Sequence, residues 1–454
     1  MDFYSIYKNL PIFSQNMICS IRGIIEKKSR FGKPFDKYFD FLQKSQYWSI
    51  EKIDNYKLEQ MKALINHVET NVPYYAEIFK KLKLTVNDFK SIEDLNKLPV
   101  LTKEDIRLNF KKLQANNISE YKTKVFHTGG SMGKALEFIS PIDIVKFRWA
   151  IFNRHKARFG INTHNWYATF TGHPAIPVRQ KSPPYWRFNY PMKQVVFTMH
   201  HMALDKTPAI VEKLNSTKLE YYTGYPSILD VLAKNILELG LSITNPPKMI
   251  FTGAEALLEN QKEVMGEVFK CKITDTYGFS EGCGNASTCE YGNYHEDFEL
   301  GILQPGEKVG LSNDILATGF KNYAMPFIRY QVGDTATFSE EKCKCGRSSN
   351  VIQQIHGRSE DYVITPEGNR IQRFDYLFKD TSGIKEAQIL QKELGIIQIL
   401  IVKRSDYDYE TESYLKKGIE KYISKTLRVD FIYTDEIERE QNGKFRAVKS
   451  LLNK

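Results

Sequence analysis

The segment Met249–Glu255, with the sequence MIFTGAE, decides the fold class of this chain. Four residues typical of a buried strand lead directly into Gly253, and the same arrangement recurs where Ile273–Tyr277 leads into another glycine. Helix-forming stretches, Ala209–Leu214 and Ser227–Leu239, come before these strands. Strands that alternate with helices indicate an α/β sheet, in which ligands bind beyond the carboxyl ends of the strands.

The same pattern extends upstream to about residue 121, where glycines separate short β-branched and aromatic runs. These runs predict strands over Tyr121–His127, Leu136–Ser140, Trp166–Phe170 and Val195–Thr198. Residues 1–110 instead have apolar positions at helical spacing, and a proline at position 73 interrupts the longest such stretch. We therefore expect a helical start followed by an α/β region.

The C-terminal part of the chain has a different pattern. A charged helix is predicted over Tyr409–Lys425, and a turn is predicted over Pro366–Asn369. Strands are predicted over Tyr362–Ile364, Arg370–Gln372, Ala387–Gln391, Ile396–Val402 and Asp430–Tyr433. Because this is the plan of a small α+β domain, we expect domains over 1–358 and 362–454 with a hinge over 359–361.

The composition is that of an ordinary globular protein. Lys and Arg number 64 against 54 Asp and Glu, which gives a net charge of +10, and 42% of the residues are hydrophobic. These values exclude disordered, collagen-like and coiled-coil proteins. No segment has the ~20 apolar residues of a spanning helix, and the N-terminus lacks the pattern of a signal peptide. We therefore expect a cytoplasmic protein.

The N-terminal segment Leu10–Ile25 allows two interpretations. It has apolar residues at helical spacing, and the basic sequence EKKSR follows it. Such a helix packs on its own domain or lies on an anionic membrane surface. We favour packing, because apolar helical faces usually meet a core, and keep peripheral contact with the inner membrane face as the second interpretation.

The stretch Thr128–Lys134 (TGGSMGK) is a candidate phosphate-binding loop. Glycines let the backbone approach phosphates closely, hydroxyls donate hydrogen bonds, and a lysine supplies positive charge. The glycine spacing is not that of a P-loop, Ala135 stands where that loop has a magnesium-binding hydroxyl, and predicted strands flank it on both sides. Taken alone, a glycine-rich hairpin loop is the commoner explanation.

Two further motifs follow the strands that define the sheet. Gly253, Ala254 and Glu255 end the first strand, and Thr276–Glu281 (TYGFSE) ends the second. In the second motif an aromatic ring can stack on a flat base, and a carboxylate can hold Mg²⁺. Taken singly, a core tyrosine and an exposed glutamate are the commoner explanations.

The last two motifs combine charge with turns. Arg329–Asp334 (RYQVGD) places a carboxylate after a glycine, where it can accept both hydroxyls of a ribose, and Gly357–Asp361 (GRSED) supplies an arginine that can reach ribose and phosphate. Asn442–Arg446 (NGKFR) predicts a type I′ turn. Each of these alone is more often an ordinary turn or a solvated charge.

The cysteines are too few for a disulfide scaffold, and five of the six lie between positions 271 and 345. Two pairs have metal-ligand spacing, C-x5-H and C-x-C. The four residues of these pairs are Cys289, His295, Cys343 and Cys345. Together they form a closed Cys₃His set, which suits structural Zn²⁺. The metal would hold the two ends of the segment 283–350 together. Cys283 is left over, because it has no partner at ligand spacing.

Together, these motifs in this order resemble the adenylate-forming superfamily of acyl-CoA synthetases, from Thr128 to Arg446. More narrowly, the chain is similar to the phenylacetate–CoA ligase group and its capsular-polysaccharide-biosynthesis relatives, several of which carry a structural zinc with similar spacing. The segments that carry the narrower resemblance are Asn71–Tyr75, Pro184–Asn189, Gly224–Ser227, Met325–Tyr330 and Cys345–Arg347. The resemblance implies a large α/β N-terminal domain of mixed sheets and helices that binds ATP and the acyl substrate, with a small mobile α+β C-terminal lid.

The resemblance also implies a role for each motif. Lys444 would be the mobile cation that bridges the carboxylate and the α-phosphate, and Glu281 would bind Mg²⁺. Asp334 would accept the ribose hydroxyls with Arg358 beside it, and Glu360 occupies the hinge. The ATP phosphates would be held by Thr128, Gly129, Gly130, Ser131, Gly133 and Lys134, and the adenine by Gly253, Ala254, Glu255, Tyr277 and Gly278.

The implied activity is the ATP-dependent activation of a small-molecule carboxylate to an acyl-adenylate, with release of pyrophosphate. The acyl group would then pass to CoA, a carrier thiol, or an amino- or hydroxy-sugar; the sequence determines neither the acid, the acceptor nor the oligomeric state. Gly130 and Met132 replace hydroxyl residues usual in the phosphate loop, which motivates an alternative, a catalytically weakened relative that binds or scaffolds in a glycan-assembly complex. We expect no nucleic-acid partner, because no basic run or RNA-recognition motif surrounds the cysteine cluster.

Overall fold

A computed structural model of the chain describes residues 6–128, 136–173, 175–309, 312–358, 363–366, 370, 371, 374, 377, 381, 383–440 and 445–452. The chain divides into two compact units. The first unit contains Met1–Ile25, Ile161–Asp275 and His356–Lys454, and the second contains Glu26–Gly160 and Thr276–Ile355. The fold is α/β, with large sheets, helices and a C-terminal α+β part, as the sequence predicts.

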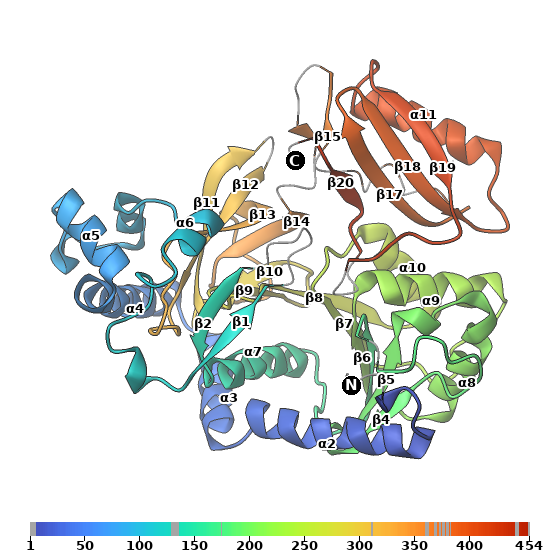
Figure 1. Cartoon of the computed structure of the whole chain (residues 1–454), viewed down its shortest axis with the longest axis horizontal. Helices are drawn as coiled ribbons and strands as arrows, with labels where there is room; N and C mark the ends of the chain where they lie inside the picture. Colours follow the sequence, from blue (N-terminus) through green and yellow to red (C-terminus); the bar gives the residue numbers. More distant parts are fainter. Residues whose placement is uncertain are drawn as a thin grey trace. The chain divides into compact units, whose positions relative to one another are not determined.

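The first unit is built around a mostly parallel sheet (Figure 1). Its strands are β3 (Tyr167–Thr171), β4 (Arg187–Asn189), β5 (Gln194–Thr198), β6 (Tyr221–Gly224) and β7 (Met249–Gly253), in the order β7-β6-β3-β5-β4. Strand β4 is antiparallel to β5, and the other pairs are parallel. Its helices are α8 (Thr207–Ser216), α9 (Pro226–Glu238) and α10 (Glu259–Phe269), with 3₁₀ turns at Tyr190–Met192, Met199–His201 and Leu204–Lys206.

Apolar side chains from this sheet and its helices form one core, which includes Phe170, Phe197, Tyr222, Ile236 and Phe269. Strand β8 (Lys272–Gly278) follows α10, and the division between the units falls within it, after Asp275. Because β3, β5, β6 and β7 are parallel, their carboxyl ends share one edge of the sheet, where the chain continues into the Gly253–Glu255 motif.

The C-terminal part of the first unit is a four-stranded sheet in the order β19-β18-β17-β20. Its elements are β17 (Ile384–Glu393), β18 (Ile396–Lys403), α11 (Tyr409–Tyr422), β19 (Arg428–Tyr433) and β20 (Val448–Ser450), preceded by the pair β15 (Val363–Ile364) and β16 (Arg370–Ile371). Figure 1 shows α11 on one face of this sheet, where Leu415 and Ile419 share a core with Ile397, Ile399 and Ile401. A separate core of this kind is what an independent α+β domain requires.

The second unit joins helices to a mainly antiparallel sheet. Its strands are β9 (Asn285–Thr288), β10 (Tyr294–Glu296), β11 (Gly301–Val309), β12 (Ser312–Gly319), β13 (Tyr330–Ser339) and β14 (Val351–Arg358), in the order β11-β12-β13-β14-β10-β9, and β9 pairs with the end of β8. The hairpin β1 (Thr123–His127) and β2 (Glu137–Pro141) stands apart as a sheet of its own. Met325, Phe327 and Tyr330 belong to the large core between this sheet and the helices.

The helices of the second unit are α3 (Lys33–Ser45), α4 (Ile50–Asn71), α5 (Pro73–Leu82), α6 (Lys103–Leu108) and α7 (Ile144–Arg158), with 3₁₀ turns at Val86–Asp88, Ile92–Lys97 and Ile118–Glu120. Pro73 begins α5 directly after α4, which confirms the predicted interruption. Helix α2 (Ile12–Arg30) starts in the first unit and ends in the second. Within the described residues, no helix combines the length and apolar character needed to cross a bilayer.

Candidate functional site

The predicted phosphate loop lies between two paired strands. β1 and β2 are antiparallel, with His127 opposite Glu137. Just beyond this pair, Thr128 donates its backbone N–H to the Leu136 carbonyl at 2.9 Å, and its Oγ1 accepts the Leu136 N–H at 2.9 Å. The predicted flanking strands are therefore confirmed. The predicted phosphate ligands Gly129, Gly130, Ser131, Gly133 and Lys134 lie outside the described residues.

In the second unit, the predicted adenine and ribose residues lie together. The Tyr277 hydroxyl, at the end of β8, donates to Oδ2 of Asp334 on β13 at 2.8 Å. Asp334 is buried and Tyr277 is partly exposed. Gly278 follows on the same strand, and a Cβ at its position would lie 2.6 Å from Oδ1 of Asn285 on β9, so a larger residue there would require the Asn285 side chain to move. A planar ring next to a carboxylate suits a base and its ribose.

The predicted magnesium ligand Glu281 is also buried in the second unit. Its Oε1 accepts a 2.5 Å hydrogen bond from the hydroxyl of Tyr330, which is the first residue of β13. Arg148 on α7 donates from Nη2 to the Phe279 carbonyl at 3.0 Å and from Nη1 to the Ser280 carbonyl at 3.2 Å. Burial lowers the pKa of Arg148, and the nearby Glu281 charge opposes that shift. Arg148 thus fixes the backbone that presents the Glu281 carboxylate.

The donor set around Glu281 fits Mg²⁺ that is bound together with phosphates. Mg²⁺ is typically held by one or two carboxylates, with substrate phosphates and waters completing its octahedron. Glu281 supplies one such carboxylate and Tyr330 orients it. Mg²⁺ at this position would therefore be coordinated by Glu281 together with the phosphates of a polyphosphate substrate, and not by protein side chains alone.

In the first unit, the Gly253–Glu255 motif lies against the C-terminal segment. Ala254 has φ +70°, an uncommon conformation for a residue with a Cβ, and it turns the chain directly after β7. The Glu255 carboxylate accepts the Ser227 N–H at 3.2 Å and the Phe445 N–H at 2.7 Å. Burial raises the pKa of Glu255, whereas these two hydrogen bonds lower it. The motif therefore binds backbone groups from α9 and from the segment that follows Lys444.

Charged contacts join the same two parts of the first unit. Lys234 on α9 donates to the Lys385 carbonyl at 2.9 Å and pairs with Asp230 at 2.9 Å. Arg439 forms an ion pair with Glu386 on β17, and its guanidinium lies 4.5 Å from the centre of the Phe445 ring. Burial raises the pKa of Glu386, and Arg439 opposes that shift.

Three predicted residues cannot be placed in the same detail. Lys444, the predicted catalytic cation, and Glu360, the predicted hinge residue, lie outside the described residues. The backbone of Arg358 ends β14, and its side chain is outside the description. Their roles stay predictions.

The predicted zinc ligands converge in the second unit. Cys289 follows β9, His295 lies on β10, and Cys343 and Cys345 lie between β13 and β14. Their four ligand atoms all lie within 4.8 Å of one another, with Cys289 Sγ 3.7 Å from Cys343 Sγ and Cys345 Sγ 3.2 Å from His295 Nε2. Tetrahedral zinc with Zn–S bonds of about 2.3 Å holds two sulfurs about 3.8 Å apart.

The environment of His295 also suits a ligand. Its Nδ1 lies 3.4 Å from the Ser349 hydroxyl, which leaves Nε2 facing Cys345. Burial, with Arg158 and Arg347 nearby, lowers the pKa of His295 to about 4, so the imidazole is neutral at pH 7. The residues present therefore fit a closed Cys₃His zinc site.

Known proteins are similar to this chain along nearly its whole length. Residues 363–451 match the family model of the CapK C-terminal domain. The chain is 25% identical to Protein CapK of Staphylococcus aureus over 449 residues, covering 97% of this chain and 98% of CapK. It is 22% identical to a phenylacetate-coenzyme A ligase of Thermus thermophilus, covering 88% of this chain and 97% of the ligase. These relatives bear out the resemblance to the adenylate-forming superfamily.

Solved structures show the same fold. A 2-hydroxyisobutyryl-CoA ligase in the postadenylation state, in complex with R3-HIB-AMP, aligns with a TM-score of 0.68 at 16% identity, covering 90% of this chain and 91% of that chain. A complex of the same ligase with 2-HIB-AMP and CoA, in an open conformation, aligns with a TM-score of 0.56. The resemblance inferred from the sequence motifs is confirmed.

Two residues that contact the TYGFSE motif were not singled out from sequence. Arg148 contacts residues more than 130 positions away, and an arginine within a helix carries no local signal. His155, also on α7, holds the start of the TYGFSE motif through a 2.8 Å hydrogen bond between Nδ1 and Thr276 Oγ1. Both lie in a helix that the sequence analysis did not predict.

Proposed function

We propose that this protein activates a carboxylic acid with ATP and then transfers the acyl group to an acceptor. In the first step a carboxylate oxygen attacks the α-phosphorus of ATP, the bond to the bridging oxygen of the β-phosphate breaks, and pyrophosphate leaves with that electron pair. The product is an acyl-adenylate. No proton is gained or lost, so the main catalytic task is to neutralise negative charge.

The observation that carries this proposal is the hydrogen bond between the Phe445 N–H and Glu255. It joins the C-terminal segment to the motif assigned to adenine, within one compact unit. Lys444 directly precedes Phe445, so the contact supports its assignment as the cation that meets the carboxylate and the α-phosphate. The ion pair of Arg439 with Glu386 and the hydrogen bond from Lys234 to Lys385 support the same arrangement.

The remaining roles in the proposal belong to the second unit. Asp334, oriented by Tyr277, would accept the ribose hydroxyls, and Glu281, oriented by Tyr330, would hold Mg²⁺. When bound, the ion would neutralise phosphate charge. Arg148 would keep the Glu281 backbone in place.

We further propose that CoA is the acceptor, because the phenylacetate-coenzyme A ligases and the 2-hydroxyisobutyryl-CoA ligase are named for this thiol. In this step the thiolate attacks the acyl carbon and AMP leaves. A sugar amine or hydroxyl is the other acceptor class that follows from the resemblance to capsular-polysaccharide-biosynthesis proteins. Rotation about the predicted hinge at Glu360 would expose the adenylate to either acceptor.

We also propose that Cys289, His295, Cys343 and Cys345 hold one structural zinc ion, a proposal that rests on the mutual distances of their ligand atoms. A closed four-ligand set leaves no open position, so the ion would stabilise the fold rather than enter the reaction. It would tie the segment between β13 and β14 to β9 and β10.

Carboxylate-dependent exchange between ATP and pyrophosphate tests the first half-reaction, screened over a panel of carboxylic acids with and without CoA or amino-sugars. We expect Lys444→Ala to lose exchange while it still binds ATP, and the exposed Lys425→Ala to retain exchange. Full exchange in Lys444→Ala would contradict the role of that lysine. Saturable ATP binding without pyrophosphate release for any acid would favour the non-catalytic alternative.

A further inference from the structure

Helix α2 packs against the first unit through polar side chains. Gln15 is buried, and its Oε1 accepts hydrogen bonds from Nε and Nη2 of Arg187 on β4, at 2.8 and 2.6 Å. Asn16 Oδ1 accepts the N–H of Phe188 at 3.0 Å. One polar face of the helix is thus bonded to the edge strand of the parallel sheet.

The next two turns continue the same inward face. Ser20 Oγ accepts the N–H of Tyr190 at 3.3 Å. Gly23 is buried, and a Cβ at its position would lie 1.8 Å from Oδ1 of Asn189. The polar and small residues of α2 therefore point into the protein along its N-terminal two thirds.

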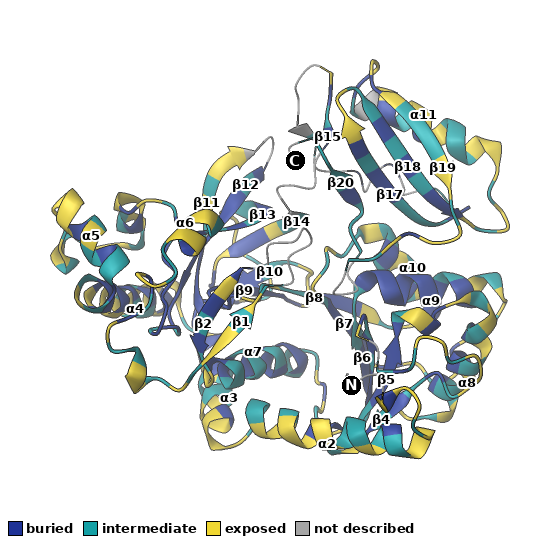
Figure 2. Ribbon diagram, in the orientation of Figure 1, coloured by how far each residue is buried: buried dark blue, intermediate teal, exposed yellow. Residues whose placement is uncertain are grey.

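The opposite side of α2 carries large apolar side chains that are exposed. Figure 2 shows exposed residues along this helix. These residues, called here the apolar face of α2, follow helical spacing and are Phe13, Met17, Ile21, Ile24 and Ile25, with exposed fractions of 78, 51, 52, 46 and 65%. A helix on a protein surface normally turns its apolar stripe toward the core and its polar face to water. In α2 this arrangement is reversed, so the packing we expected for these residues is provided by the polar side chains instead.

Basic residues adjoin the apolar face. α2 contains four basic residues and one acidic residue, Glu26, which pairs with Arg30 at 3.1 Å. Lys28 lies one turn after Ile24 on the same side of the helix, and Lys27 is its neighbour. Within the described part of the chain, Lys27 and Lys28 form no ion pair, and both are exposed.

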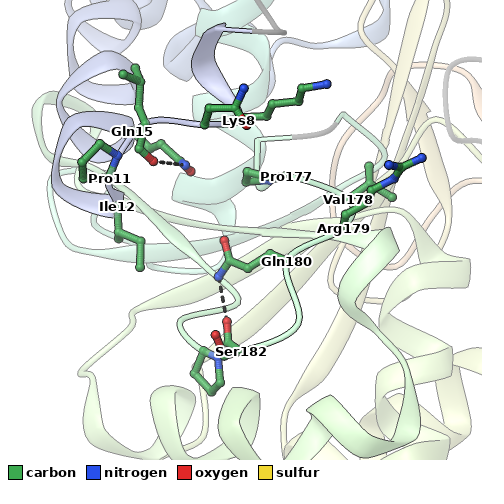
Figure 3. A pocket seen from close by; sticks show the side chains of 12 residues that line it. Lys8, Pro11, Ile12, Gln15, Pro177, Val178, Arg179, Gln180 and Ser182 are labelled. Atoms are coloured by element: carbon green, nitrogen blue, oxygen red, sulfur yellow. Dashed lines mark hydrogen bonds between the residues drawn. The ribbon is translucent and has the colours of Figure 1, made fainter.

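The other end of α2 borders a cavity of about 780 Å³ (Figure 3). Lys8 and Arg179 line it together with Ile12 and Val178. Val178 is 47% exposed, so cations and apolar side chains meet there as they do near Lys28. Basic residues thus lie near both ends of α2.

We propose that α2 binds the surface of an anionic phospholipid bilayer, with its apolar face among the upper acyl chains and its lysines among the phosphates. Interfacial helices have this combination of an apolar stripe and flanking Lys or Arg. A second copy of this chain is the weaker candidate, because antiparallel pairing of two α2 helices would bring Lys27 and Lys28 of one copy toward Lys8 of the other. The bilayer offers opposite charge at both ends.

Vesicle flotation with the full chain tests this binding. We expect the protein to float with phosphatidylcholine vesicles that contain about 30 mol% phosphatidylglycerol, and roughly ten-fold less with pure phosphatidylcholine. The double variant Phe13→Gln/Ile21→Gln should lose binding roughly ten-fold. Leu108→Gln on α6, whose side chain is 74% exposed, is the matched control and should bind like the wild type.

Two further variants separate the apolar and electrostatic contributions. Lys27→Glu/Lys28→Glu should reduce binding at low salt and remove most of its salt dependence. In Phe13→Trp, brominated lipids should quench the added tryptophan. Equal binding to neutral and anionic vesicles, or flotation unchanged in the Phe13→Gln/Ile21→Gln variant, would overturn the proposal. A dimer that the same double substitution dissociates, without vesicle binding, would assign the face to a second copy instead.

Discussion

The Glu255 carboxylate accepts a 2.7 Å hydrogen bond from the backbone N–H of Phe445, the residue that follows Lys444. It also accepts the Ser227 N–H at 3.2 Å, so one carboxylate holds two backbone donors that lie more than 200 residues apart in sequence. If this contact sets the adenylation geometry, its loss should slow the first half-reaction more than the second.

Glu255→Gln should therefore lower the rate of ATP–pyrophosphate exchange roughly ten-fold or more, because the amide is a weaker acceptor and brings an N–H₂ group toward two donors. Acyl transfer from a preformed acyl-adenylate should change much less, and stopped-flow kinetics of each half-reaction measures the difference. Glu263→Gln, an exposed glutamate on α10, is the control. Equal slowing of both steps would argue against a role in positioning.

The Tyr277–Asp334 pair predicts a graded loss of nucleotide affinity. Asp334→Asn should raise the Kd for ATP about ten-fold or more, because a hydrogen bond to a charged group is worth about 1.5–3 kcal/mol. Tyr277→Phe keeps the ring and removes only the hydroxyl that orients Asp334, so its effect should be smaller. Isothermal titration calorimetry measures both. A Tyr277→Phe effect as large as that of Asp334→Asn would mean that the hydroxyl itself contacts the ligand.

We predict that Arg148 affects the binding of Mg²⁺ without contacting the ion. Arg148→Gln should remove at least one of the two hydrogen bonds to the Phe279 and Ser280 carbonyls. The backbone that presents Glu281 then loosens, so we expect a several-fold rise in the Mg²⁺ concentration needed for half-maximal exchange. A change in the maximal rate with an unaltered Mg²⁺ requirement would show that Arg148 does not act through Glu281.

The Cys₃His cluster predicts a stoichiometric metal. Elemental analysis of washed protein should show about one zinc per chain. Cys345→Ser should lose the zinc and lower the melting temperature, whereas Cys271→Ser, outside the cluster, should retain the zinc. A folded wild-type protein without metal after purification in zinc-containing medium would refute the site.

From the burial of His155 we predict that the folded protein loses stability in acid. Burial lowers its pKa from 6.5 to about 3, so the folded state binds this proton less readily than the unfolded state. Its contribution is therefore complete above about pH 6.5 and is lost as the pH falls toward 3. Between pH 7 and 5 the loss is about 2 kcal/mol, from ~1.36 kcal/mol per pKa unit.

His155→Gln should reduce this dependence on pH, because glutamine offers a hydrogen bond to Thr276 without titrating. Urea unfolding of both proteins at pH 7 and pH 5 measures the difference. His164→Gln, at an exposed position, should behave like the wild type. An equal loss in the wild type and in His155→Gln would assign the acid sensitivity to other groups.

Most strands of the parallel sheet were predictable, because each is a short apolar run that ends at a glycine or a polar residue. Strand β7 spans Met249–Gly253 where Met249–Thr252 was predicted, and β8 spans Lys272–Gly278 where Ile273–Tyr277 was predicted. In the C-terminal sheet β17, β18 and β19 were predicted, whereas β20 was not. The four residues of the Cys₃His cluster were singled out from their spacing, and their side chains do converge.

Helix α7 was not predicted, because its apolar spacing does not continue through its second half. Ile144, Phe147 and Ile151 are buried at helical spacing, but the buried residues that follow are all polar: Asn153, Arg154, His155 and Lys156. Arg154 is compensated by ion pairs with Asp297 and Glu299, which lie more than 140 residues away and leave no local pattern. Helix α2 was predicted as a helix, yet the direction of its apolar face depends on Arg187 and Asn189, which its own sequence does not reveal.

Two hydrogen bonds join Thr128 to Leu136 just beyond the paired residues of β1 and β2. The described residues on either side of positions 129–135 therefore hold the register of this hairpin. We therefore expect that a hydroxyl-rich sequence of equal length at these positions leaves the pairing of β1 with β2 intact. Its effect on phosphate binding can then be measured separately from its effect on folding.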